Sequence, residues 1–252
     1  MFFKDSFLPQ AQTIEVNIEN EKLHGLKVLQ LSDLHIDKRS SIKKLVHVVN
    51  TSNLLKVDII VLTGDVIDCK VEYIKDKLEV LKHLKPKVYY ISGNHDLYYG
   101  LGELRVLFDS FNFIDMDNSF LPIKYNGEFF YLAGLSDRFS KFFGIKREEK
   151  RIIEYLKDNK PSLFISHQPK DYKIALEAQS SLFLCGHTHG GQIFPFHLLV
   201  RLFQPFLSGL HYKNKMAIYV NKGLGTWGLK YRFLAPCELT MLQLISNKKR
   251  VE

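Results

Sequence analysis

The sequence has few cysteines and no long apolar run. Only Cys69, Cys185 and Cys237 occur among its 252 residues, and they are far apart. An odd number of widely spaced cysteines forms neither a C-x-x-C metal pair nor a disulfide framework, so we expect a reducing compartment, the cytoplasm. The first residues also lack a basic start followed by a long apolar segment. Neither a signal peptide nor a membrane-spanning helix is therefore predicted.

The net charge excludes fewer classes of function than the cysteine content does. Lysine and arginine outnumber aspartate and glutamate by 35 to 27, which gives a net charge of +8. Such a surface attracts nucleic acid, anionic lipid or a nucleotide, but charge alone does not choose among these partners or show that any is bound. A chain of this length can bury a full core, and it contains no internal repeat or low-complexity linker. We therefore predict a single domain over residues 1–252.

The hydrophobic pattern predicts an α/β fold. Short apolar runs typical of buried strands lie at 28–31, 58–62, 87–91, 163–165, 181–185, 216–221 and 239–245. Helical spacing predicts helices that begin at Ser40 or Ser41, pass through 74–81 and end near Pro86, and cover 104–111 and 152–156. Residues 121–132 differ, because Asn126-Gly127 predicts an antiparallel hairpin. Strict alternation over 13–18 predicts a half-exposed edge strand.

Residues that commonly bind metals follow five of these predicted strands. In chain order they are Asp33 and His35, then Asp65, then Asn94, His95 and Asp96, then His167, and finally His187 and His189. The glycines around the last pair allow a sharp turn, so both imidazoles can point from the strand end at one centre. Read singly, each is an ordinary turn residue or histidine. Five ordered blocks at strand ends together predict one site.

The residue types indicate the chemistry. Imidazole combined with carboxylate selects manganese, iron or zinc over calcium, which prefers oxygen ligands alone, and we expect manganese foremost. Two ions fit this number of ligands better than one, since a single aspartate such as Asp65 can bridge ions about 3.5–4 Å apart. Water between the ions becomes hydroxide near neutral pH and can attack phosphorus in line. The predicted reaction is hydrolysis of a phosphate ester.

The order D-x-H, G-D, G-N-H-D, a lone histidine and G-H-x-H resembles the calcineurin-like metallophosphoesterases along nearly the whole chain. The resemblance implies an α/β sandwich of two packed mixed β-sheets flanked by helices. It implies one metal ion held by Asp33, His35, Asp65 and His189, and a second held by Asp65, Asn94, His167 and His187. His95 would contact the phosphate or protonate the leaving group, and Asp96 would orient His95.

Two later segments, G-L-G-T at 223–226 and A-P-C-E-L at 235–239, resemble the small bacterial phosphodiesterases of this family. Many members of that subgroup carry an N-terminal membrane or export segment, which this sequence lacks. The resemblance implies hydrolysis of a phosphodiester or pyrophosphate, and a lipid A precursor such as UDP-diacylglucosamine is a candidate substrate. A nuclease, a cyclic-nucleotide phosphodiesterase and a non-catalytic metal-binding scaffold are the alternatives. A β-lactamase-type zinc hydrolase is excluded, because its H-x-H-x-D-H cluster does not occur.

Residues 193–212 are too apolar for an ordinary solvated connection and too short to span a bilayer. One interpretation is a core segment or a subunit interface. The other is an insertion that forms an apolar lid beside the metals and contacts a membrane surface or acyl chains, with Arg201, Lys213 and Lys215 near anionic head groups. The second interpretation would make the protein peripheral on the inner face of the membrane.

Other polar residues near the blocks have two interpretations. Asp37, Asp68 and Asp137 either orient ligating histidines or are solvated loop carboxylates. Cys185 is expected to be a small core residue. No ligand role is assigned to the histidines outside the blocks, which are His24, His47, His83, His197 and His211.

Overall fold

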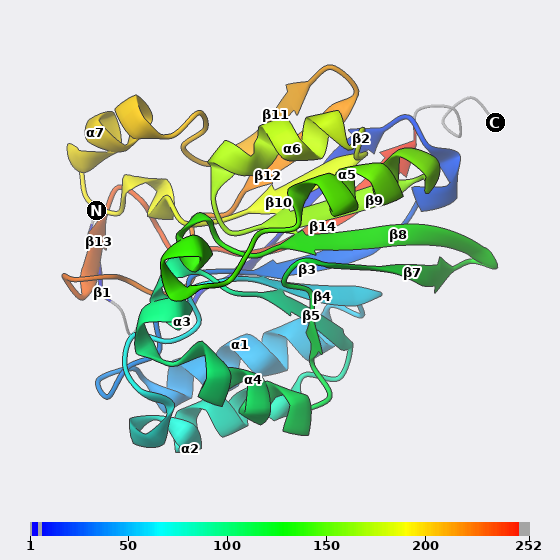
Figure 1. Ribbon diagram of the computed structural model, residues 1–252. Coiled ribbons are helices and arrows are strands. Elements are labelled where there is room, and N and C mark those ends of the chain that lie inside the picture. Colours follow the sequence, from blue (N-terminus) through cyan, green and yellow to red (C-terminus); the bar gives the residue numbers. More distant parts are fainter. Residues whose placement is uncertain (1, 5–6, 247–252) are drawn as a thin grey trace.

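The computed structural model describes residues 2–4 and 7–246, so residues 1, 5–6 and 247–252 of the predicted domain lie outside the described residues. Two six-stranded sheets pack face to face, and helices cover the outer face of each sheet (Figure 1). The predicted α/β sandwich of two mixed sheets flanked by helices is confirmed.

The first sheet combines strands from the N-terminal half with the last strand of the chain. Its order is β2 (Ala11–Ile18), β14 (Leu239–Ser246), β3 (Lys27–Leu31), β4 (Ile59–Thr63), β5 (Lys87–Ile91) and β6 (Ile114–Asp115). Strands β3 to β6 are parallel, whereas β14 is antiparallel to β3 and parallel to β2. β2 lies at the edge of the sheet, as its alternating pattern predicted.

The second sheet has the order β11 (Gly209–Lys213), β12 (Met216–Val220), β10 (Leu182–Cys185), β9 (Ser162–Ser166), β8 (Glu128–Leu135) and β7 (Ser119–Tyr125). Its four inner strands are parallel and its two outer strands antiparallel. Asn126 and Gly127 join β7 to β8 with φ of 48° and 83°, because a two-residue hairpin turn requires positive φ at both positions. A separate pair joins β1 (Phe2–Lys4) to β13 (Tyr231–Phe233).

The helices pack through the apolar residues that their spacing brings to one side. On the first sheet lie α1 (Ile42–Leu54), α2 (Lys75–Leu78) and α4 (Leu101–Ser110), and on the second lie α5 (Glu149–Asp158) and α6 (Tyr172–Glu177) (Figure 1). Ser41 caps α1 by accepting a hydrogen bond from the Lys44 amide. The helix predicted through 74–81 is instead divided among η2 (Val71–Tyr73), α2 and η3 (Glu79–His83).

The remaining helical elements are short. They are η1 (Glu21–Leu23), α3 (Asn94–Tyr99), η4 (Arg138–Phe143), η5 (Pro169–Asp171), η6 (His189–Gly191) and α7 (Phe196–Phe203). Within the described ranges, none of the helices combines the length and the apolar character needed to span a bilayer.

Three buried apolar clusters hold these layers together. One lies between the two sheets, and the other two lie under the helices of each outer face. Because successive strand residues point to opposite faces, a fully buried strand such as β4 contributes to both: Ile60 faces α1, and Val61 faces the other sheet. This packing fixes the two sheets against each other, and with them the loops that follow β3, β4, β5, β9 and β10.

Candidate metal centre

The polar blocks predicted from sequence meet at one end of the sandwich. Each follows a parallel strand, and the carboxyl ends of neighbouring parallel strands form one edge where ligands bind in α/β proteins. Three groups have ligand atoms within 4.8 Å of one another: Asp33, His35 and His189; His35, Asp65 and His95; and Asp65, His167 and His187. Asn94 lines the same cavity as these residues. The structure thus brings all seven predicted metal ligands together.

The backbone at this edge is strained. Five of the non-glycine residues at the site, Asp33, His35, Asp65, His187 and His189, have φ between 44° and 72°. Such conformations cost on the order of 1–3 kcal/mol each and persist only where the surroundings enforce them. Close packing provides that enforcement: a Cβ on Gly186 would collide with Ser32 and Asp33. The strained turns aim side chains from separate loops at a common centre.

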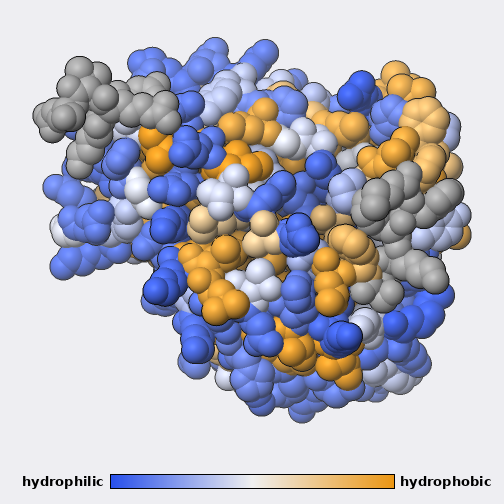
Figure 2. Space-filling view, turned by 180° about the vertical axis from the view of Figure 1, so that it is seen from behind, coloured by the Kyte–Doolittle hydropathy of each residue, from blue (hydrophilic) through white to orange (hydrophobic). Residues whose placement is uncertain are grey.

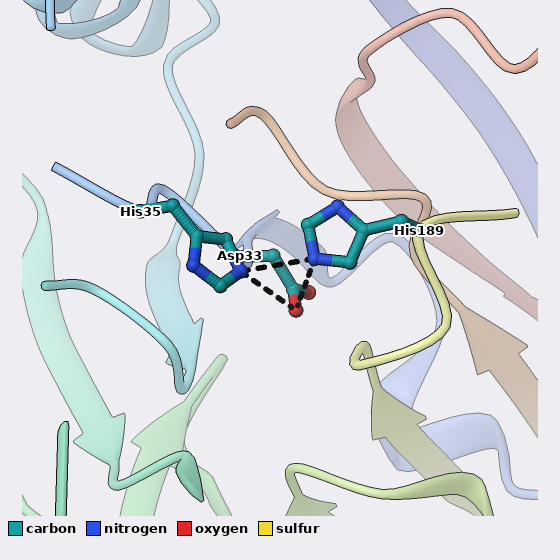
Figure 3. Close-up of side chains that lie close together, drawn as sticks. All are labelled: Asp33, His35 and His189. Carbon is teal, nitrogen blue, oxygen red and sulfur yellow. Dashed lines mark hydrogen bonds and ion pairs between the residues drawn. The ribbon is translucent and has the colours of Figure 1, made fainter. Parts of the chain in front are cut away.

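Asp33, His35 and His189 form the first cluster (Figure 3). Asp33 Oδ1 lies 3.3 Å from His189 Nε2 and 3.9 Å from His35 Nε2, and the two Nε2 atoms are 3.0 Å apart. All three residues are at most 1% exposed. The His187 amide donates to both Asp33 oxygens at 3.1 Å, which fixes the orientation of this carboxylate.

Asp65 connects the first cluster to the second. Its Oδ2 lies 3.6 Å from His35 Nε2 and 3.2 Å from His167 Nε2, while its Oδ1 accepts a hydrogen bond from the His95 amide. His187 Nδ1 lies 3.2 Å from His167 Nε2. His167 Nδ1 is 2.8 Å from the Thr63 carbonyl, so this nitrogen carries a proton and Nε2 faces the site. One carboxylate oxygen is therefore shared by both clusters.

These residues fit divalent cations. Asn94 Oδ1 is buried and has no hydrogen-bond partner among the described residues, although a buried amide oxygen normally has one. The donor set of four imidazoles, two carboxylates and this amide oxygen matches the preferences of transition metals. Two cation positions sharing Asp65 account both for the unpartnered amide oxygen and for ring nitrogens that face one another.

The charges of the cluster match this interpretation. Burial alone raises the pKa of Asp33 and Asp65, but His189 beside Asp33 and His167 beside Asp65 bring both pKa values below the usual range. Burial lowers the pKa of His187 to about 3 and that of His189 to about 4. Charged carboxylates and neutral imidazoles are the protonation states that metal binding requires.

The pKa of His167 is shifted in the opposite direction to those of His187 and His189. Burial lowers its pKa, but Asp65 first and Asp33 next raise it well above the ordinary value. Without a cation, Asp65 thus favours a second proton on the ring nitrogen that faces it. A metal ion would replace this proton, because ligand binding to a metal requires the free lone pair.

His95 has a different partner from the one predicted. Its Nδ1 is hydrogen-bonded to Asp68 Oδ1, which also lies 3.3 Å from His35 Nδ1. The Asp96 carboxylate instead accepts hydrogen bonds from the amides of Val66, Ile67 and Gly93. The prediction that Asp96 orients His95 is wrong, since consecutive helical residues point in different directions. Of the two interpretations of Asp68, the structure supports a partner for histidines.

The pKa values of Asp96 and His95 are both raised by their surroundings. Burial and then the charge of Asp65 raise the pKa of Asp96 to about 7. Burial lowers the pKa of His95, but the hydrogen bond with Asp68 and the charge of Asp65 raise it above its ordinary value on balance.

Asp37 and Asp137, the other two aspartates considered as partners of ligating histidines, do not bond a predicted ligand among the described contacts. Asp37 pairs with Lys230 at 3.1 Å, and Asp137 accepts from Gln168 Nε2 at 2.9 Å.

A cavity of about 570 Å³ opens above the cluster. His35, Asp65, Asn94, His95, His187 and His189 line its floor, and its apolar walls are Phe196, Leu199, Val200 and Phe203 of α7 together with Trp227 and Leu229. Sequence reasoning missed the second wall, which lies about 40 residues beyond the last block of predicted ligands, His187 and His189. Gln192 holds this wall in place by accepting from the Trp227 amide at 3.0 Å and donating to its carbonyl at 2.9 Å.

The chain is similar in sequence to phosphoesterases. The sequence profile of the calcineurin-like phosphoesterase family matches residues 26–191, which include every predicted ligand. A metallophosphoesterase of Helicobacter pylori is 33% identical over 233 residues, 89% of this chain and 61% of that protein. The metallophosphoesterase YkuE of Bacillus subtilis is 30% identical over 245 residues, 93% of this chain and 84% of that protein. The chain spans about three fifths of the Helicobacter pylori relative.

Two further similarities concern animal proteins. A transmembrane protein with a metallophosphoesterase domain from Danio rerio is 30% identical over 250 residues, 94% of this chain and 57% of that protein. The crystal structure of a dimetal phosphatase from Danio rerio superposes with a TM-score of 0.53 at 13% identity, over 80% of this chain and 88% of that one. At this identity the superposition shows a shared fold. The matching profile, these relatives and the clustered histidines and aspartates agree, and the chain belongs to the calcineurin-like phosphoesterase family.

Proposed function

We propose that the protein hydrolyses phosphate esters with two divalent metal ions, manganese foremost, with iron or zinc as alternatives. Asp33, His35, Asp65 and His189 hold one ion, and Asp65, Asn94, His167 and His187 hold the other. The observation that carries this proposal is the position of Asp65 Oδ2 between His35 and His167. When bound, such ions act as Lewis acids on the phosphoryl oxygens and lower the pKa of the attacking water.

The chain itself supplies orientation and a proton. The Thr63 carbonyl accepts a hydrogen bond from the outer ring nitrogen of His167, and Asp68 Oδ1 lies 3.3 Å from the outer ring nitrogen of His35. These contacts keep the inner nitrogens turned toward the ions. His95 lines the cavity, and its side chain is 25% exposed. Because His95 Nδ1 donates a hydrogen bond to Asp68, Nε2 is the atom of His95 that contacts the phosphate or gives a proton to the leaving oxygen. Asp68 and His95 thus act as a pair, with Asp68 as the positioning residue.

The apolar walls of the cavity support a phosphodiester or pyrophosphate that carries an apolar group. Phe196, Leu199, Val200 and Phe203 face the cavity from one side of α7. Leu198 and Leu202 lie on another side of α7 and are 56% and 79% exposed. Figure 2 shows hydrophobic residues gathered at the upper right, the end of the molecule where α7 lies. α7 contains no buried residue, which argues against the core interpretation of residues 193–212.

A helix with one apolar face toward the substrate and another toward solvent suits an enzyme that works at a membrane surface. Arg201 on α7 and the net charge of +8 favour anionic lipid over neutral surfaces. The Danio rerio relative is named as a transmembrane protein. We therefore propose a membrane-derived substrate, with UDP-diacylglucosamine as the candidate to test first, and peripheral attachment to the inner face of the membrane.

Metal removal tests the catalytic proposal. The protein is stripped with chelator, its metal content is measured by mass spectrometry, and hydrolysis of bis(p-nitrophenyl) phosphate and p-nitrophenyl phosphate is followed while manganese, iron, zinc or calcium is added. We expect two ions per chain at saturation, loss of activity on stripping and recovery with manganese. Calcium should not restore activity, because imidazole suits it poorly. Full activity in metal-free protein would refute the proposal.

Two matched pairs of substitutions on α7 test the membrane proposal. Leu198→Ser with Leu202→Ser changes the outer face, and Leu199→Ser with Phe203→Ser changes the cavity wall. The outer pair should weaken binding to anionic liposomes and leave hydrolysis of the small soluble diester unchanged. The wall pair should raise KM for a lipid-linked pyrophosphate more than for the soluble diester. Unchanged liposome binding in the outer pair contradicts membrane contact through α7.

The nuclease alternative is tested on the wild-type protein. DNA and RNA are offered over a salt series, because a protein that neutralises many phosphates loses affinity steeply as salt rises. Rapid nucleic-acid hydrolysis with that salt dependence, and none of the lipid-linked pyrophosphate, would replace the membrane-derived substrate by nucleic acid.

A further inference from the structure

One arginine is buried directly behind the metal cluster. Arg232 lies in β13 and is 2% exposed, which makes it the largest of the fully buried side chains among the described residues. Burying a guanidinium is costly unless its five N–H groups find acceptors, since the group cannot accept hydrogen bonds itself. Its donors reach backbone carbonyls of five residues: Gly225, Lys222, Gly223, Ala235 and His189.

Three of these five carbonyls, those of Gly223, Gly225 and Ala235, belong to the two segments (residues 223–226 and 235–239) whose sequence resembles the bacterial phosphodiesterases. The first of them is fixed to the loop that carries Asp33: the Leu224 amide donates to the Ser32 carbonyl at 3.0 Å, and the Gly225 amide donates to the Asp33 carbonyl at 2.7 Å. Arg232 Nη1 lies 3.3 Å from the His189 carbonyl. The guanidinium therefore connects the loop of Asp33 with the loop of His189.

Arg232 also contacts the His189 ring. Its Nη2 lies 3.0 Å from His189 Nδ1. Because a guanidinium only donates, Nδ1 accepts, and the neutral ring carries its proton on Nε2, which is held toward Asp33 Oδ1 and His35 Nε2. A cation bound at Nε2 would have to displace that proton, and Arg232 would then stabilise the deprotonated ring. A turn of the ring would break this contact and remove Nε2 from the cluster.

We propose that Arg232 is a positioning residue for the metal site of Asp33, His35 and His189, and this inference rests on the proposed function. Two effects oppose each other here. The positive charge of Arg232 repels a cation bound nearby, whereas its contacts with both loops hold the ligands in place. The proposal states that positioning outweighs repulsion, so removal of Arg232 weakens metal binding at this site and leaves the site of Asn94, His167 and His187 filled.

The test compares Arg232→Met, Arg232→Lys and the control Lys160→Met. Lys160 is also a cation that donates to backbone carbonyls, those of Ala178 and Gln179, but it precedes β9 and lies at the strand end away from the metal cluster. Metal content after dialysis against limiting manganese and the paramagnetic resonance spectrum of bound manganese are recorded. Neither readout depends on catalysis. Circular dichroism and thermal unfolding establish that each variant is folded.

Wild type and Lys160→Met should bind two manganese ions per chain and give the spectrum of a coupled pair. Arg232→Met should bind one ion tightly, give the spectrum of an isolated ion, and bind the second about 10- to 100-fold more weakly, the range for residues that support metal ligands. Arg232→Lys keeps the charge without the planar fork and should also lose the coupled spectrum.

A folded Arg232→Met protein that binds two ions as tightly as wild type, or more tightly, overturns the proposal. If Arg232→Met does not fold, Arg232→Lys decides alone, and two ions with wild-type affinity in that variant refute positioning. A wild-type protein that binds no manganese, iron or zinc is a failure of the proposed function, which is distinct from either result.

Discussion

His95 and Asp68 should act as one unit, which a double-substitution cycle can measure. Replacing His95 with alanine removes the proposed proton donor and should lower kcat by about 10²–10⁴. At about 1.36 kcal/mol per tenfold, this is about 2.7–5.4 kcal/mol of transition-state stabilisation. Metal content should remain near that of wild type, because the residue assigned to the metal in this block is Asn94. Loss of an ion from His95→Ala would make His95 a ligand and refute this role.

Asp68→Asn keeps the shape of the side chain and removes its charge. A hydrogen bond to a charged group contributes about 1.5–3 kcal/mol, which corresponds to a loss of about 10- to 150-fold in kcat. In the His95→Ala background most of this effect should disappear, since Asp68 then acts only through His35, 3.3 Å away. The assay is kcat/KM for a soluble diester at saturating manganese. Losses that multiply fully in the double variant would show that the two residues act independently.

Other substitutions test the shared ligand and the packing around it. Asp65→Ala should reduce bound metal at both positions, and two tightly bound ions in that variant would refute bridging. Asn94→Ala should weaken binding of the ion assigned to Asn94, His167 and His187 and leave the ion assigned to Asp33, His35 and His189 bound. Metal content measures both. Gly225→Ala should lower the free energy of unfolding by about 1–3 kcal/mol, because its Cβ would collide with the Leu34 carbonyl. Gly102→Ala, with open space around the added Cβ, should raise it by up to about 1 kcal/mol. Denaturant titration measures both, and equal effects would contradict the steric argument.

Local patterns determined most of the fold. Short apolar runs were recognisable as β3, β4, β5, β9 and β10 because strands buried on both faces are apolar throughout. A cap at Ser40 or Ser41 was recognisable because a serine before an amphipathic run satisfies a free helix amide, and the structure shows that the cap is Ser41. The broken helix at 71–83 was not predicted, since periodicity does not distinguish a continuous helix from 3₁₀ turns that keep the same residues buried.

The candidate site was predictable for the same reason. Each block of predicted ligands directly follows a strand, and parallel strands end at a shared edge, so Asp33, Asp65 and Asn94 are brought together by the rules of sheet formation. Sequence alone determined this set of residues and the chemistry it suits.

Tertiary structure decided how these residues are oriented and what surrounds them. Asp68 rather than Asp96 contacts His95, because side-chain direction on a helix depends on where the helix packs. Trp227 and Arg232 lie far along the chain from the predicted ligands, yet the fold brings Trp227 to the cavity wall and Arg232 to His189. No local sequence pattern predicts contacts between residues so far apart in the chain. The exposure of α7 was undecided in sequence for the same physical reason: an apolar helix is buried only if another surface is present to cover it.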